Sequence, residues 1–152
     1  MTVLLVDLDG VLGDTRPLWH AWLVHAARVL GVEPEALPDD RGAAAEALDA
    51  RGAGNWRALL ERFAEDRAPV YLRPAADASI ALRRLAASDA RIGVFTDAPE
   101  ELARVALAHL GAERRVEALE AGAEALQRLR SRLGSEDASV IRTRDELVGA
   151  AL

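Results

Sequence analysis

Hydrophobic positions divide the chain into short apolar runs and longer stretches with helical spacing. The clearest short run covers residues 3–6 and ends in acidic residues, and a second covers residues 91–96. A weaker run covers residues 139–142, and a marginal one covers residues 115–118. Short continuous apolar runs are typical of buried strands in a parallel sheet. Because helical stretches separate these runs, we predict an α/β fold with a Rossmann-like parallel sheet.

The stretches between the runs carry apolar residues at positions i, i+3 and i+4, the spacing of amphipathic helices. One begins near Trp19 and ends at Gly31, and another follows Asn55, which we expect to be its N-cap. The sequence of residues 39–54 predicts a short helix with loose ends. A last helix starts at Thr143, because Thr-Arg-Asp-Glu fits a capping box. Further helices are expected around Leu82, before Gly111 and before Gly134.

An all-helical block lies between the first two clear strands of the predicted sheet. We expect residues 1–15 and 72–152 to form the Rossmann-like core, and residues 16–71 to form a small helical cap inserted after the first strand. Ligands of open α/β sheets bind outside the carboxyl ends of the strands. The cap is therefore expected to lie over the ligand site of the core.

Composition narrows the classes of function that this architecture could serve. The chain has 152 residues, enough for one domain with a sizeable core, and its net charge of −6 argues against binding to nucleic acid or to an anionic membrane. It has no cysteine, which excludes disulfides and thiolate chemistry, and all 19 basic residues are arginine, which excludes lysine chemistry. The first apolar run is too short and too acidic for a signal peptide or a membrane span, so we expect a cytoplasmic protein. The oligomeric state is left open.

The strongest chemical signal is a pair of carboxylates at the end of the first run. Asp7 and Asp9 are two residues apart, so alternation along a strand would send both side chains to the same side. Gly10 lets the chain leave the strand sharply. Such a pair suits Mg²⁺, which prefers a few hard oxygen ligands, and one carboxylate could attack phosphorus while the other moves a proton. Taken alone, the two acids fit a solvated acidic turn equally well.

The nine residues from Asp7 to Thr15 resemble the first signature of the haloacid dehalogenase superfamily, an apolar strand followed by Asp-x-Asp-Gly and then Asp-Ser/Thr. The resemblance implies that Asp7 is the nucleophile, which forms an aspartyl-phosphate, and that Asp9 is the general acid–base. The run that ends in Thr96 resembles the second signature, which implies that Thr96, together with Gly10, binds the substrate phosphate. The resemblance further implies Mg²⁺ held by Asp7 and Asp9, and a small phosphorylated metabolite as substrate.

The helical block after the first signature is similar to the capped branch of this superfamily, which includes phosphoglycolate phosphatase and β-phosphoglucomutase-like proteins. The resemblance covers residues 1 to about 134. One departure is Asp97, which follows Thr96 where relatives often carry asparagine. Because an acid would repel a phosphate, we favour the interpretation that Asp97 is the N-cap of the next helix, with Glu100 as its capping-box partner.

The third family signature, which supplies a lysine that neutralises the nucleophile and the phosphate, is absent. Glu120 stands at the equivalent place. Two like charges about 4 Å apart repel by roughly 4 kcal/mol at an effective dielectric constant of about 20. Arg114, Arg115 or Arg128 could replace the lysine, but solvated surface charges explain these arginines as well, and we favour this second interpretation.

The fourth signature, a strand followed by Gly-Asp and a second acid that completes the Mg²⁺ site, does not follow Gly134. The run at residues 139–142 and the helix after it are more similar to the final strand and trailing helix of the family, which implies that the fourth-signature strand is deleted. In a competing alignment this run is the fourth strand itself, and Asp145 reaches the metal. An ordinary helix cap at Thr143 explains the same residues.

Two functions follow from these signatures. The first is a phosphohydrolase that acts on a small phosphorylated metabolite through an aspartyl-phosphate, with a cap that excludes water and selects the substrate. The second is a catalytically degenerate relative that binds a ligand or a protein partner. The intact set of Asp7, Asp9 and Thr96 favours the first function, whereas the missing lysine and the missing fourth signature favour the second.

Overall fold

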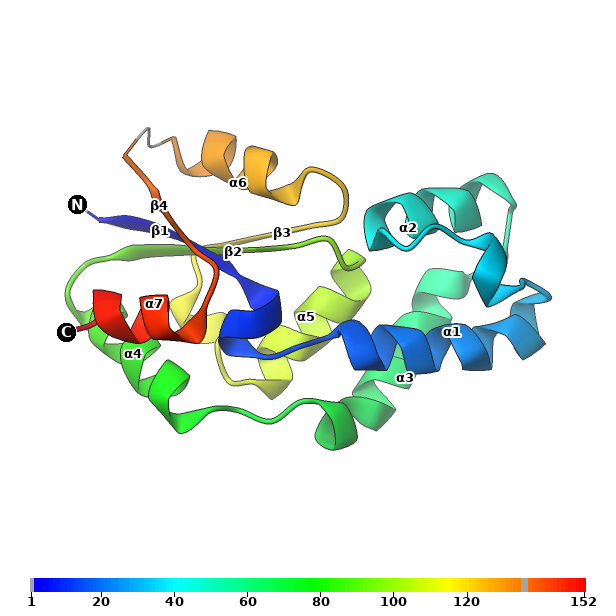
Figure 1. The fold of residues 1–152 in the computed structure, drawn as a ribbon, viewed down its shortest axis with the longest axis horizontal. Helices are drawn as coiled ribbons and strands as arrows, with labels where there is room; N and C mark the ends of the chain where they lie inside the picture. Colours follow the sequence, from blue (N-terminus) through cyan, green and yellow to red (C-terminus); the bar gives the residue numbers. More distant parts are fainter. Residues whose placement is uncertain (1, 135–136) are drawn as a thin grey trace.

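A four-stranded parallel sheet forms the centre of the protein, of which a computed structural model describes residues 2–134 and 137–152 (Figure 1). The strands are β1 (Val3–Asp7), β2 (Arg91–Thr96), β3 (Ala118–Ala121) and β4 (Ser139–Ile141), in the order β3-β2-β1-β4. Parallel pairing brings the carboxyl ends of β1 and β2 side by side, with Asp7 opposite Phe95. The predicted α/β class with a Rossmann-like sheet is confirmed.

Helices surround the sheet and extend beyond one of its ends. They are α1 (Arg16–Leu30), α2 (Arg41–Ala50), α3 (Trp56–Tyr71), α4 (Ala76–Ala87), α5 (Glu100–His109), α6 (Ala125–Leu133) and α7 (Arg144–Ala150). In the part of the chain that the structure describes, none of the helices has the length and the apolar character needed to cross a membrane.

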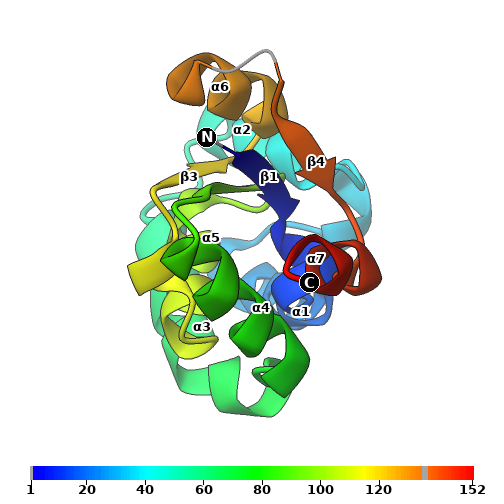
Figure 2. The same ribbon diagram turned by 90° about the vertical axis from the view of Figure 1, so that its left-hand side faces the viewer.

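Alternation along β1 sends its side chains into two apolar layers. Val3 and Leu5 pack in one layer with Leu129 of α6. Leu4 and Val6 pack in the other, larger layer, which α4, α5 and α7 complete. Figure 2 shows α6 on one side of the sheet and these three helices on the other. Because both faces of β1 are covered, the strand is apolar at every position before its terminal acid, as expected for a buried parallel strand.

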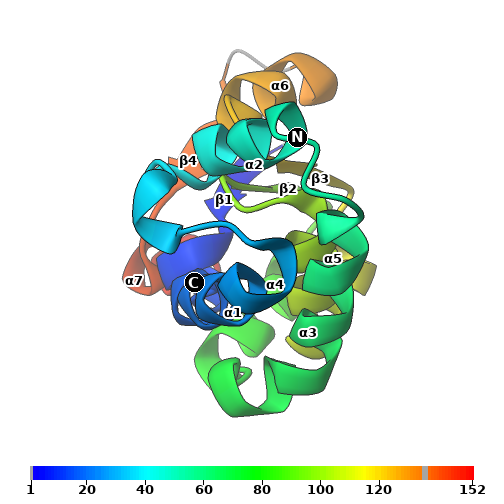
Figure 3. The same ribbon diagram turned by 90° about the vertical axis from the view of Figure 1, so that its right-hand side faces the viewer.

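The helices α1, α2 and α3 occupy residues 16–71, called the helical segment below, and lie beyond the carboxyl ends of the strands (Figure 3). Three buried tryptophans join α1 to α3: the ring centroid of Trp22 lies 5.2 Å from that of Trp19 and 5.8 Å from that of Trp56. The indole N–H of Trp22 has no hydrogen-bond partner among the described residues. The division of the chain into a core and a cap at these bounds stays a prediction.

Local signals in the sequence predicted most element ends correctly. Gly31 ends α1 in a left-handed conformation, as its position suggested. The Thr143 side chain accepts a hydrogen bond from the Glu146 backbone N–H, which confirms Thr143 as the N-cap of α7. The Glu146 carboxylate accepts from the Thr143 hydroxyl instead of the backbone N–H that a capping box uses. Asn55 does precede α3, but its side chain makes no capping bond.

The strand predicted at residues 115–118 is wrong in position, because the strand in the structure begins three residues later. Residues 113–115 form a 3₁₀ turn, and β3 begins only at Ala118. Pairing with β2 sets this register, because Gly93 lies opposite Ala118 and Phe95 lies opposite Glu120. An edge strand this short carries too little periodicity to fix its own position in the sequence.

Candidate active site

The two acids of the first signature lie together at the carboxyl end of β1. Asp7 is the last residue of the strand, and its Oδ1 accepts a hydrogen bond of 3.2 Å from the Asp9 backbone N–H. Gly10 has a φ of +93°, a conformation that residues with a Cβ rarely adopt, and its backbone N–H donates to the Gly13 carbonyl at 2.7 Å. The predicted sharp turn after the strand is therefore present, and it folds the chain back so that Asp9 faces Thr15.

The Asp9 carboxylate is held by four donors and is only 11% exposed. Oδ1 accepts from the backbone N–H and the hydroxyl of Thr15, at 2.8 and 2.7 Å. Oδ2 accepts from the Thr96 hydroxyl at 2.9 Å and from Arg41 Nη2 at 2.5 Å. The structure thus places Thr96 beside Asp9 and directs its hydroxyl to that carboxylate, and the role of Thr96 in phosphate binding stays a prediction. Each oxygen of the Asp9 carboxylate accepts two hydrogen bonds, and one of the four donors is a charged guanidinium.

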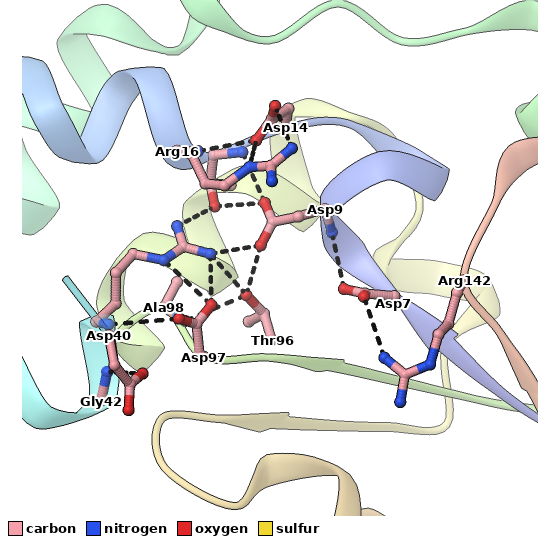
Figure 4. A network of polar contacts seen from close by, with 12 residues as sticks. Asp7, Asp9, Asp14, Arg16, Asp40, Gly42, Thr96, Asp97, Ala98 and Arg142 are labelled. Atoms are coloured by element: carbon pink, nitrogen blue, oxygen red, sulfur yellow. Dashed lines mark hydrogen bonds and ion pairs between the residues drawn. The ribbon is translucent and has the colours of Figure 1, made fainter.

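Arg41 is the main residue of the site that sequence reasoning missed. It is the first residue of α2, yet its side chain is 4% exposed and reaches the strand ends. Its partners Asp9 and Asp97 are labelled in Figure 4. Besides Asp9, it donates to the Thr15 hydroxyl at 2.7 Å and to Asp97. Burial acts to lower the pKa of Arg41, but the charges and hydrogen bonds of Asp9 and Asp97 outweigh it and raise the pKa. The sequence around Arg41 is rich in alanine and acids and carries no motif that would single this arginine out.

The interpretation of Asp97 as a helix N-cap is wrong. Pro99 holds the N-cap position of α5, and no side chain caps that helix. Asp97 Oδ1 instead accepts from Arg41 Nη2 at 2.7 Å and from Arg41 Nε at 3.2 Å. Burial acts to raise the pKa of Asp97, but the hydrogen bonds and charge of Arg41 lower it below its ordinary value. A charge-assisted bond to a guanidinium is stronger than a neutral bond to a backbone N–H, which explains the choice of partner.

Asp7 is more open than Asp9 and is less well stabilised as an anion. Its side chain is 25% exposed, and the nearest cation is Arg142, whose Nη1 lies 3.8 Å from Oδ2. Arg142 follows β4, which pairs with β1, and Val6 lies opposite Ile141 in that pairing, so Arg142 comes next to Asp7. Partial burial, followed by the charge of Asp9, raises the pKa of Asp7 to about 6.

The arginines weighed as substitutes for the missing lysine do not face Asp7. Arg114 and Arg115 lie in the 3₁₀ turn before β3, at the opposite end of the sheet from the site. Arg128 donates to Glu120 at 3.1 Å, to the carbonyl of Ala121 at the end of β3 and to that of Ala123 in the loop that follows. Arg132 also binds Glu120, at 3.2 Å, so that acid is balanced by two arginines of α6.

The third carboxylate that the competing alignment takes from Asp145 does not join Asp7 and Asp9 in a metal-binding group among the described residues. Asp145 is exposed in the first turn of α7, the helix that Thr143 caps. Among residues 2–134 and 137–152, no group of three or more His, Cys, Asp or Glu side chains is placed to hold a metal ion. The arrangement gives the competing alignment of β4 no support, and the capping role of Thr143 accounts for these residues.

A cavity of about 290 Å³ opens beside Arg41, between the helical segment and the end of β2. It is lined by Arg16, Trp19, His20, Asp39, Arg41 and Asp97. Its volume lies near the lower end of the range for small-molecule sites. The position fits the expectation that ligands bind outside the carboxyl ends of the strands.

The arrangement of the sheet and its helices resembles the fold of haloacid dehalogenase-like proteins. Solved structures that it resembles include CbbY from Rhodobacter sphaeroides in complex with phosphate, with a TM-score of 0.64 and 16% identity over 99% of this chain and 83% of that one. β-Phosphoglucomutase from Clostridium difficile matches with a TM-score of 0.61 and 17% identity, over 99% of this chain and 82% of that one. A HAD phosphatase from Thermococcus onnurineus matches with a TM-score of 0.56 and 19% identity, over 93% and 76%.

At these identities the likeness is one of fold. No protein-family model matches the sequence, and no curated protein matches it. The predicted resemblance to the phosphoglycolate phosphatase and β-phosphoglucomutase branch is thus confirmed in the three-dimensional arrangement of the chain.

Proposed function

We propose that this protein is a haloacid dehalogenase-like phosphohydrolase that acts on small phosphorylated metabolites. The observation that carries the proposal is the Asp7 carboxylate, which stands partly open at the carboxyl end of a central strand with Asp9 beside it. Solved structures with this fold include a phosphatase and a phosphoglucomutase, and one was solved with phosphate. A cavity large enough for a small molecule lies beside Arg41 and Asp97, although Asp7 is not among its lining residues.

In the proposed first step, an Asp7 oxygen attacks phosphorus and forms an aspartyl-phosphate. Asp9 has to enter this step as the neutral acid; the bond between phosphorus and the alcohol oxygen breaks, and the leaving oxygen takes the Asp9 proton. In the second step, water attacks phosphorus, the bond to Asp7 breaks, and Asp9 takes the proton from the water. Arg142 balances the charge that builds up at the phosphoryl group, while the Thr96 hydroxyl donates to one of its oxygens. The Gly10 N–H can donate to another oxygen only after it leaves the Gly13 carbonyl.

Asp9 must change partners to serve as the acid–base. Both of its oxygens are engaged by donors, so a proton can reach the carboxylate only when one of these bonds is exchanged. The hydroxyls of Thr15 and Thr96 are the donors that rotate freely about a single bond. Substrate oxygens that accept from the Thr96 hydroxyl would release Asp9 Oδ2 from one of its two donors.

The fold family implies Mg²⁺, but the residues present do not fit this ion in their present arrangement. Mg²⁺ needs oxygen ligands with free lone pairs in octahedral geometry. Both oxygens of Asp9 are already engaged, and the described residues gather no group of three acids around Asp7. The steps above therefore use only groups of the chain itself, and dependence on Mg²⁺ is a matter for the assay.

The state of Asp9 favours a second function, the binding of a ligand or protein partner without turnover. Asp9 accepts four hydrogen bonds, one of them from a buried arginine, and it has to break one of them before it can take up a proton. In such a protein the cavity would still bind a phosphorylated ligand, but no ester would be cleaved.

The two functions are separated by an assay for phosphate release from a panel of phosphate esters, with and without Mg²⁺. For a phosphohydrolase we expect release by the wild-type protein and none by Asp7→Asn, which has no nucleophile. Arg142→Met is expected to lose about tenfold or more in kcat/KM, the usual effect of removing one charged group that stabilises the transition state. Release that persists in Asp7→Asn would contradict the proposed mechanism.

A matched control is Asp66→Asn, which makes the same chemical change at an exposed position of α3. It is expected to retain full activity. If the wild-type protein releases no phosphate from any ester but is stabilised by a phosphorylated ligand in thermal unfolding, binding without turnover replaces the proposal.

A further inference from the structure

One nitrogen of Arg41 lies between two carboxylates, as a bound cation would. Nη2 is 2.5 Å from Asp9 Oδ2 and 2.7 Å from Asp97 Oδ1, and the Thr96 hydroxyl oxygen is 3.4 Å away (Figure 4). The nitrogen therefore has oxygen neighbours from the turn that follows β1 and from the carboxyl end of β2. The positive charge of Arg41 and the negative charges of Asp9 and Asp97 are in direct contact at this nitrogen.

Asp9 and Asp97 require a cation between them. Two carboxylates that contact the same atom repel each other, and partial burial increases the cost of leaving them unbalanced. Proteins meet this requirement with a metal ion or with a cationic side chain. A guanidinium is charged at every pH at which the protein folds, so it stays a cation where a lysine or histidine could lose its proton.

The backbone around Arg41 is built to hold it in place. Asp40 caps α2 and accepts from the Gly42 N–H at 3.1 Å, which fixes the start of the helix. Gly42 packs directly on the loop after β3, where an added Cβ would lie 2.8 Å from the Ala123 nitrogen. This close approach lets the Arg41 side chain reach the strand ends from the helical segment.

We propose that Arg41 is a built-in cation that takes the place of a divalent metal ion between Asp9 and Asp97. The wild-type protein then binds no Mg²⁺ at this point, because the position is filled by a group that cannot dissociate. Removal of the guanidinium leaves two carboxylates that face one another across a gap, and carboxylate oxygens are the ligands that Mg²⁺ and Mn²⁺ prefer. This inference goes beyond the proposed function, since it holds whether or not an ester is cleaved.

The test is thermal unfolding of the full chain, followed by circular dichroism, in a chelator and in increasing Mg²⁺ or Mn²⁺. The wild-type Tm is expected to be the same in all of these solutions. The Tm of Arg41→Ala is expected to be lower than that of the wild type in chelator and to rise with metal concentration until the site is full. In Arg41→Ala/Asp97→Asn this rise should be largely lost, because one of the two carboxylate ligands is gone.

Arg16→Ala is the matched control, since Arg16 is exposed, pairs with Asp14 and contacts neither Asp9 nor Asp97. It should gain no response to metal. If Arg41→Ala does not fold, Arg41→Gln takes its place under the same expectations. A saturable rise in the wild-type Tm with metal concentration would overturn the proposal. A folded Arg41 variant whose Tm does not change with metal would also overturn it. So would a rise in Tm that is as large in the double variant with Asp97→Asn as in the Arg41 variant alone. None of these results depends on phosphate release, so the proposed function is tested separately.

Discussion

Asp7 and Asp9 are identical side chains two residues apart, yet their surroundings differ. Asp9 has four donors, one of them the buried Arg41. Asp7 has one backbone N–H at 3.2 Å and a partly exposed arginine at 3.8 Å. Partial burial without matching donors raises the pKa of Asp7 to about 6, so its ionised form opposes folding.

This difference predicts how Asp7→Asn changes stability with pH. Because the pKa is raised from its ordinary value of 3.8, Asp7 favours the folded state below about pH 4, and this contribution is lost as the pH rises through about 6. Asparagine resembles the neutral form at every pH. We therefore expect Asp7→Asn to match the wild type near pH 4 and to be more stable by about 1–2 kcal/mol above pH 7, as measured by urea unfolding.

The exposed Asp66→Asn serves as the control here too, and its stability difference from the wild type should not vary over this range. An Asp7→Asn variant less stable than the wild type at neutral pH would mean that Asp7 is well paired in its ionised form.

The residues of the site differ in how far the sequence could predict them. Asp7, Asp9 and Thr96 were found because they end apolar runs, and parallel pairing brings such ends together. Arg41 lies 32 residues from Asp9, in a helix whose packing no local pattern specifies. Asp97 was predicted to cap the helix that follows it because capping rules consider only neighbours in sequence. Its partner in the structure is Arg41, which comes from the helical segment.

At the scale of elements, α6 lies close to β2 because Gly93 has no side chain. A Cβ at this position would lie 2.8 Å from Cδ1 of both Leu129 and Leu133. These two leucines are buried in the apolar layer between α6 and the sheet. The glycine therefore determines the spacing between a helix and the strand beneath it.

We expect Gly93→Ala to lower the free energy of unfolding by about 1–3 kcal/mol, the usual effect of an extra carbon in a filled core. Chemical denaturation measures the change. Gly149→Ala is the control, since Gly149 lies in α7 and a Cβ there would meet no atom within 4 Å. The free energy of unfolding of that variant should rise by about 0.5 kcal/mol, because alanine has a higher helix propensity than glycine. Equal stability of the two variants would show that α6 adjusts freely.

The bounds of helices and strands could be predicted where burial makes a strand continuously apolar or where a capping residue marks the end of a helix. The strands β1 and β2 are buried on both faces and are continuous apolar runs, so their bounds could be found within one residue. The strand β3 covers Ala118–Ala121 at the sheet edge, where it is only partly buried and contains glutamate and alanine, so it is not a continuous apolar run. Its register depends on β2, which a local pattern does not encode.

At the scale of the whole molecule, separate contacts join the helical segment to the sheet and its helices. Arg41 binds both strand ends through Asp9 and Asp97. Arg57 of α3 binds Glu101 of α5 at 3.0 Å. A third contact is the packing of Gly42 on the loop after β3.

Gly42→Ala tests this third contact. The added Cβ would lie 2.8 Å from the Ala123 nitrogen and 3.0 Å from its Cα, and backbone atoms cannot yield as a flexible side chain does. We expect a loss of about 1–3 kcal/mol in the free energy of unfolding, although alanine is the better helix former. Gly149→Ala again controls for helix propensity. A Gly42→Ala protein as stable as the wild type would mean that α2 rests only loosely on the loop.

The tryptophan cluster gives the helical segment an optical signature of its own. The three tryptophans and the single tyrosine of the chain all lie between residues 19 and 71, and the tryptophan rings are buried within 6 Å of a neighbour. Fluorescence therefore originates in this segment, while the sheet contributes no tryptophan or tyrosine. A shift in emission without a matching loss of far-ultraviolet circular dichroism would show the helices parting from an intact sheet. The natural chain thus carries its own reporter for movement over the candidate active site.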